Sequence, residues 1–137
     1  MNKNKKGFTL IELLAVIAIL AILIVLAVPN ILNIFNDSKE RAFLTQAQSI
    51  YKTAETQYVS AQLSPTPVTA FCNAADGSTT LDLEAPSNVK YSIVFTNGKI
   101  SSFKVTDGTY TYTNTSINSI SDISAVSSTA WAGTACD

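Results

Sequence analysis

Near its start the chain has a long uninterrupted run of apolar residues. The residues that follow mix polar and apolar side chains but keep the spacing of an α-helix. Leu13 to Val28 are sixteen consecutive apolar residues. As a helix they would span about 24 Å, and residues 8–12 extend the segment to about 30 Å, which just crosses the apolar layer of a bilayer. Beyond it, apolar residues recur at three- and four-residue steps, which predicts an amphipathic helix over residues 31–62. The recurring positions are Phe43, Ala47, Ile50, Ala54 and Tyr58.

Pro29 lies where the two helical patterns meet. Proline lacks an amide hydrogen and clashes with the carbonyl group one turn earlier, so we expect a helix kink or a locally loosened stretch at this residue. If the helix broke completely, Asp37 or Ser38 would be suited to cap a second helix. Two closely spaced prolines, Pro65 and Pro67, predict the end of helical structure.

The second half of the chain has the alternation of β-strands. The β-rich runs of residues 89–116 are separated by Asn97-Gly98 and Asp107-Gly108, dipeptides suited to two-residue hairpin turns, which predicts an antiparallel meander. Such a meander has one apolar face that cannot stand alone in water, and the amphipathic helix is its available partner.

The remaining segments connect or follow these elements. We interpret residues 63–88 as a connecting loop, with a short strand near residues 79–84, and residues 117–137 as a C-terminal region pinned by isoleucines at three-residue steps. The fold class predicted is therefore α+β, in which a long N-terminal α-helix packs on a small antiparallel sheet of three or more strands.

Charge and composition narrow the chemistry. The chain has nine Lys and Arg, ten Asp and Glu, and no His. Three of the lysines precede the apolar run, so the remainder is mildly acidic and has no basic stripe for a nucleic acid. The lack of His removes the commonest general base and neutral metal ligand. Because the acidic residues also form no ligand run, we expect no metal and no cofactor; the positions considered were Asp76, Asp82, Glu84 and Asp122.

The two cysteines, Cys72 and Cys136, lie beyond the apolar segment, where an exported domain would be. In that setting a pair of cysteines is more often a disulfide than a redox motif, and two are too few for a zinc site. The bridge would close a loop of about 65 residues and stabilise the fold by about 4 kcal/mol in the chain-entropy model. Two unrelated buried thiols are the alternative.

Glu12 is a carboxylate at the head of the apolar run. An unpaired acid in a membrane costs roughly 2.5 to 3.5 kcal/mol on insertion scales, so we expect it to have a partner. Lysines on one side only predict that the N-terminus lies inside and the remainder outside. A cleaved secretory signal peptide would begin in the same way, but this run is longer than a usual signal core and Pro29 lies where the cleavage site would fall.

The stretch KKGFTLIELLAVIAILAILIVLAVPN resembles the N-terminus of type IV prepilins and related pseudopilins. A short basic leader of residues 1–7 ends in Gly7, Phe8 follows, Glu12 comes four residues later, and residues 8–30 form the apolar helix. The resemblance implies that a prepilin peptidase cuts between Gly7 and Phe8 and methylates the new amino group of Phe8. It further implies a structural subunit with no catalytic residues and not an enzyme.

The resemblance also gives Glu12 a role in subunit assembly. Cleavage would convert the neutral amide nitrogen of Phe8 into a positively charged amine, which is a partner for the Glu12 carboxylate. The pair could form within one chain, about one helical turn apart, or between neighbouring subunits of a helical bundle, and the resemblance favours the second. The alternative is a simple membrane anchor with Glu12 near the membrane surface.

These expectations define a function. We expect a type IV pilus subunit that starts in the cytoplasmic membrane and polymerises as a homo-oligomer into an extracellular helical filament for adhesion, motility or DNA uptake. Its other partners would be an assembly platform protein and its ATPase. The first alternative is a pseudopilin of a type II secretion or competence system. The second is a membrane-tethered adhesion or binding module.

Overall fold

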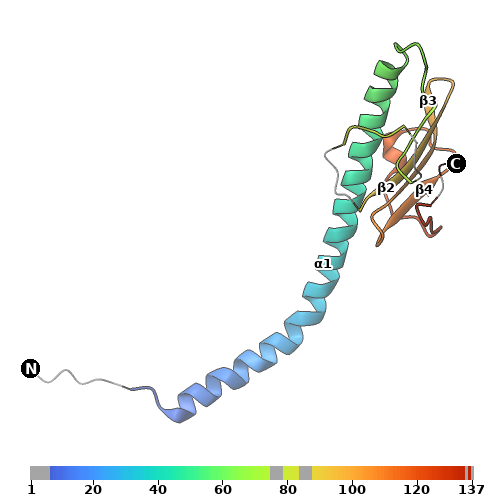
Figure 1. The fold of residues 1–137 in the computed structure, drawn as a ribbon. Coiled ribbons are helices and arrows are strands. Elements are labelled where there is room, and N and C mark those ends of the chain that lie inside the picture. Colours follow the sequence, from blue (N-terminus) through green and yellow to red (C-terminus); the bar gives the residue numbers. More distant parts are fainter. Residues whose placement is uncertain (1–6, 75–78, 84–87, 135, 137) are drawn as a thin grey trace, which may run out of the picture. The chain divides into compact units, whose positions relative to one another are not determined.

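The computed structural model describes residues 7–74, 79–83, 88–134 and 136. The basic residues of the predicted leader before Gly7 therefore lie outside the described residues. The chain divides into two compact units, an N-terminal unit of residues 1–38 and a C-terminal unit of residues 39–137. The predicted α+β class is confirmed (Figure 1), and the elements are α1 (Leu10–Ala61), β1 (Ala70–Cys72), β2 (Lys90–Thr96), β3 (Lys99–Thr106), β4 (Thr111–Asn114) and the 3₁₀-helix η1 (Ile120–Asp122).

Helix α1 continues through Pro29 without a break. The predicted second cap at Asp37 or Ser38 is therefore not used, because no helix starts there. The Ser38 hydroxyl instead donates a hydrogen bond of 2.7 Å to the carbonyl oxygen of Ile34 within the same helix. A kink at Pro29 stays a prediction. Residues 62 and 63 form a turn after the helix end, ahead of Pro65 and Pro67, as the sequence predicts.

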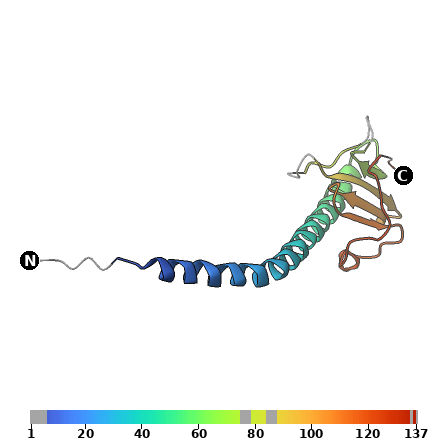
Figure 2. The ribbon, with the colours of Figure 1, turned by 90° about the horizontal axis from the view of Figure 1, so that it is seen from below.

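The second half of α1 lies against one face of the sheet (Figure 1 and Figure 2). The buried side chains of the C-terminal unit form one core that includes residues of this helix and of the sheet. The predicted helical face is confirmed, because Ala47 and Ile50 are fully buried and Tyr58 is half-buried. Aromatic rings join the two layers. Tyr51 meets Phe103 edge-on at 5.6 Å between ring centroids. Tyr58 stacks on Phe95 at 3.9 Å. These contacts supply the burial that a small sheet needs to be stable.

The described strands form one antiparallel sheet in the order β1-β2-β3-β4. The predicted meander supplies three of its strands, and Ile93 of β2 pairs with Phe103 of β3 on the buried face. Asn97 and Gly98 between β2 and β3 both have positive φ, 53° and 82°. That is the backbone of the predicted type I′ turn, which suits the right-handed twist of the strands.

Two local expectations are wrong. Asp107-Gly108 is not a two-residue turn, because β3 and β4 are separated by the four residues 107–110. The Asp107 carboxylate accepts hydrogen bonds from the amides of Thr109 and Tyr110, at 2.8 and 2.7 Å, and this side-chain capping favours the wider loop. No strand occupies residues 79–83. The extra strand is β1, which adds to the edge of the sheet beside β2.

The C-terminal region returns to α1 at Ile123, whose carbonyl oxygen accepts a hydrogen bond of 2.8 Å from the Gln48 side chain. Its last residues then run from the β4 edge of the sheet to β1. Ser127 lies along β4, where its amide donates to the Thr111 carbonyl at 2.8 Å and its hydroxyl accepts from the Thr113 amide at 2.7 Å. Gly133 lies over the paired ends of β2 and β3, since a Cβ atom there would approach Cβ of Lys90 to 2.8 Å and Cγ2 of Thr106 to 3.3 Å. Cys136 reaches β1 at the other edge. We call the described part of residues 127–136 the C-terminal strap.

Candidate functional site

The predicted processing segment begins just before α1. Gly7, Phe8 and Thr9 precede the first helical residue, Leu10. Phe8 exposes 91 % of its surface, and a Cβ atom built on Gly7 would meet nothing within 4 Å. The peptide between Gly7 and Phe8 therefore lies outside regular helix hydrogen bonding and is open to an approaching enzyme. Gly7 adds no side chain that would block such an approach.

Glu12 has partners within its own chain, and they come from Thr9. The Thr9 amide and the Thr9 hydroxyl both donate to Oε2 of Glu12, at 2.8 and 2.9 Å. In return the Glu12 amide donates to the Thr9 hydroxyl oxygen at 3.3 Å. This reciprocal arrangement is a capping box, which satisfies amide groups that a helix start leaves without acceptors. The carboxylate also lies at the positive end of the helix dipole.

The expected pairing of Glu12 with the amine of Phe8 concerns the processed chain and stays a prediction. Thr9, not Phe8, provides the described hydrogen bonds to the carboxylate. These donors are neutral, so they satisfy the oxygen atom without cancelling its negative charge. The sequence already carried the signal for Thr9, because Thr-Leu-Ile-Glu at residues 9–12 fits the capping-box pattern that precedes an apolar run.

The apolar helix that follows is exposed throughout the N-terminal unit. Leu20 exposes 51 % of its surface and Phe35 exposes 56 %. The first part of α1 is long and apolar enough to cross a membrane, and none of that window is buried within the chain. A core helix of a soluble domain would bury such side chains, so this segment needs an apolar environment from outside its own chain.

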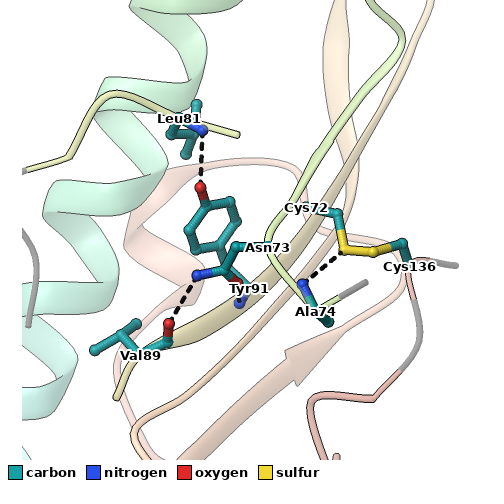
Figure 3. The surroundings of a disulfide bond; sticks show 7 residues. All are labelled: Cys72, Asn73, Ala74, Leu81, Val89, Tyr91 and Cys136. Carbon is teal, nitrogen blue, oxygen red and sulfur yellow. Dashed lines mark hydrogen bonds between the residues drawn. A yellow bond between two sulfur atoms is a disulfide. The ribbon is translucent and has the colours of Figure 1, made fainter. Parts of the chain in front are cut away.

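The second candidate site is the disulfide that joins Cys72 to Cys136, with 5.7 Å between their Cα atoms (Figure 3). Asn73 beside it continues the pairing of β1. Its side-chain nitrogen Nδ2 donates to the Val89 carbonyl at 2.8 Å, and its side-chain oxygen accepts from the Tyr91 amide at 2.7 Å. The bridge thus fastens the strap to an edge strand that side-chain hydrogen bonds also hold.

Tyr91 of β2 binds the connecting loop near this edge of the sheet. Its hydroxyl accepts a hydrogen bond of 2.8 Å from the Leu81 amide, as Figure 3 shows. Burial raises the pKa of Tyr91 above its ordinary value of 10.0, and the hydrogen bond from Leu81 opposes that rise in part. Gln57 of α1 holds the same loop through two hydrogen bonds to the backbone of Asp82. These features are structural and provide no reactive group.

Among the residues that the structure describes, no three His, Cys, Asp or Glu side chains gather as a metal site would require. Of the acidic positions considered in the sequence, Asp82 and Asp122 are described, whereas Asp76 and Glu84 lie outside the described residues.

Comparison with known protein families identifies the N-terminal segment. Residues 2–28 match the family described as the prokaryotic N-terminal methylation motif. The chain matched no curated protein and no solved structure. The motif and the long apolar helix together are consistent with a signal of the type IV pilin kind, and they support a protein of the type IV pilin or pseudopilin type with a membrane-anchoring helix.

Proposed function

We propose that this protein is a structural subunit of a type IV pilus. A membrane prepilin peptidase removes residues 1–7 and methylates the amino group of Phe8. The processed chain then waits in the cytoplasmic membrane as a single-pass protein with its N-terminus inside. An assembly platform protein and its ATPase add it to a homo-oligomeric filament outside the cell. The chain performs no catalysis itself.

The exposed apolar helix is the observation that carries this proposal. Its side chains lack burial within the chain, and a methylation motif lies at its head. Lipid can cover that surface before assembly, and the same helices of other copies can cover it afterwards. The C-terminal unit has a core of its own. The apolar part of α1 is therefore the main surface that lipid or other copies must cover.

Glu12 couples processing to assembly in this proposal. Cleavage creates a positively charged amine at Phe8, next to the residue that already holds the Glu12 carboxylate. The amine of a neighbouring copy can then neutralise a charge that the Thr9 donors leave in place. Burial of both charges in the filament makes docking in any other register costly, because an uncompensated charge would be left in apolar surroundings.

Replacement of Glu12 tests this coupling. We expect Glu12→Ala to reduce surface filaments at least about tenfold, because the charge pair that selects the assembly register is lost. The chain should remain abundant in the membrane. Asp82→Ala, which removes an exposed carboxylate from the connecting loop of the C-terminal unit, is the matched control and should leave filaments unchanged. Both quantities are measured by immunoblots of sheared surface material and of membranes. Normal filaments from Glu12→Ala would reject the proposed role.

A pseudopilin of a type II secretion or competence system is the nearest alternative, because it shares the whole processing segment. The genes beside this one discriminate the two: a retraction ATPase favours a pilus, whereas a secretion or competence cluster favours the pseudopilin. A membrane-tethered binding module is the other alternative, and it requires that mature protein keep an unmethylated Phe8.

A further inference from the structure

The C-terminal unit carries one exposed apolar spot. Val59 and Leu63 expose 67 % and 89 % of their surfaces, and among the described residues of this unit they are the large aliphatic side chains that remain exposed. Val59 lies in the last turn of α1, and Leu63 lies two residues beyond the end of the helix. The other large aliphatic side chains in the described part of this unit are buried or half-buried, so this pair is the unit's candidate for an apolar contact. We call it the apolar spot.

The same unit also has a groove of about 630 Å³ between α1 and the loop that joins β3 to β4. Ala42 and Gln46 of the helix lie along one wall and Tyr110 of the loop lies along the other. The rings of Phe43 and Tyr110 contact each other with centroids 5.8 Å apart and form its aromatic part. Lys39 is the first residue of α1 that lines the groove. We call it the helix–loop groove.

The spot and the groove cannot meet within one chain, but their spacing matches between copies. Val59 follows Phe43 by sixteen residues, which is about 24 Å along an α-helix. The same step of sixteen residues relates Glu55 to Lys39. Glu55 is exposed and lies one turn before Val59, as Lys39 lies one turn before Phe43. A shift of one copy along the helix axis by about 24 Å relative to the next therefore brings Val59 to the groove and Glu55 to Lys39.

The two surfaces also face different directions. At about 100° per residue, the groove side of α1 at Lys39, Ala42 and Gln46 and the spot side at Val59 lie roughly 120° apart around the helix. A contact in which one surface of a copy meets a different surface of the next copy is heterologous. Repetition of such a contact produces a ring or an open helical filament rather than a closed symmetric dimer.

We propose that the apolar spot of one copy docks in the helix–loop groove of a second copy, with Glu55 of the first against Lys39 of the second. The inference rests on the proposed function, because it needs many copies assembled side by side. The apolar spot is small, so the main adhesive surface remains the N-terminal helix. The charged pair and the spot fix how far one C-terminal unit is displaced from the next.

A charge exchange in the full-length chain tests the pairing. Lys39→Glu alone and Glu55→Lys alone each place like charges together and should lower the yield of sheared filaments about tenfold. The double exchange Lys39→Glu with Glu55→Lys restores opposite charges in every contact and should bring the yield back to within about twofold of the unaltered chain. Lys99→Glu, at the exposed first residue of β3, controls for the charge change and should leave the yield unchanged.

A photo-crosslinker at position 63 tests the docking directly. In assembled filaments it should capture a second copy within residues 39–49 or 107–110, identified by mass spectrometry of the crosslinked peptides. Capture at other residues, or a double exchange that fails to restore filaments, would overturn the inference. If the unaltered chain is processed and forms filaments in that same experiment, the proposed function stands. If it forms none, the proposed function fails and the docking inference fails with it.

Discussion

The two units of this chain use apolar side chains in opposite ways. In the N-terminal unit, the large apolar side chains from Leu10 to Phe35 expose 46 % or more of their surface, whereas in the C-terminal unit Phe103 and Ile93 are completely buried. The difference lies in what each sequence can bury against. A helix that is apolar on all sides has no face to leave in water, but an amphipathic helix needs only one partner. The second half of α1 finds that partner in the sheet.

This contrast shows where the free energy of each unit comes from. The C-terminal unit contains its own core, its strap and its disulfide, so its stability is a property of one chain. The N-terminal unit depends on lipid or on other copies, so its stability depends on its surroundings. Substitutions in the C-terminal unit should therefore change the free energy of unfolding of the single chain. Substitutions in the N-terminal unit should instead change membrane anchoring or assembly.

The largest expected effect on folding is at the centre of the sheet. Phe103→Ala should destabilise the C-terminal unit by about 3 to 5 kcal/mol, because it leaves a cavity under Tyr51 and Tyr112. Leu20→Ala in the N-terminal unit should change the same free energy by less than about 0.5 kcal/mol. Denaturant unfolding of the detergent-solubilised full chain, followed by Trp131 fluorescence, measures both. Equal losses from the two variants would remove the distinction between the units.

Loss of the disulfide should have the next largest effect. Cys136→Ser should cost up to about 4 kcal/mol, because the cross-link that closes a 64-residue separation no longer restricts the unfolded chain. Amide hydrogen exchange should become faster in residues 128–134 of the strap and stay unchanged in the first half of α1. Reductant added to the unaltered chain should reproduce both results. Unchanged exchange in the strap would show that the bridge does not hold it.

The strap crossing gives a smaller and more local prediction. Gly133 has φ of +67°, and a Cβ atom there would lie 2.8 Å from Cβ of Lys90. Gly98 has a similar φ of +82° but open space around it. Each change to Ala costs about 1 to 2 kcal/mol for the left-handed backbone, and only Gly133→Ala adds the steric conflict. Thermal unfolding should therefore show a larger loss for Gly133→Ala, and equal losses would argue against the strap contact.

The smallest effect concerns alkaline pH. Burial raises the pKa of Tyr91 and of Tyr51 above 10.0, and nearby acids add to the rise at Tyr51. The unfolded chain therefore releases these protons at lower pH than the folded chain. Stability should be constant below about pH 10 and should fall as the pH rises further, because the folded state then holds more protons. Urea midpoints across pH 8 to 11 measure this decline, and Tyr91→Phe should reduce its slope.

The sequence was sufficient for features that depend on local pattern. The periodic face at Phe43, Ala47 and Ile50 identified the buried side of α1, because helical period alone decides which residues share a face. Asn97-Gly98 identified its turn, because both residues tolerate positive φ. The motif around Gly7 and Glu12 needed only linear spacing.

Features that depend on tertiary contacts could not be predicted from the sequence. β1 has three residues, and its place beside β2 depends on Asn73 and on the sheet itself rather than on a periodic pattern. Asp107 widened its loop because its carboxylate reached two amides. The path of the strap over Lys90 depends on Gly133, whose neighbours are distant in the sequence. The Thr9 contribution, in contrast, was readable from the capping-box pattern and was missed.

Mass spectrometry of material sheared from the cell surface tests the central claim most directly. The account predicts an intact mass that begins at Phe8, carries one added methyl group at that amino terminus and lacks two hydrogens because Cys72 and Cys136 are bonded. The same material should appear as filaments. A chain that keeps residues 1–7, or one found only in membranes with an unmethylated Phe8, would contradict the account.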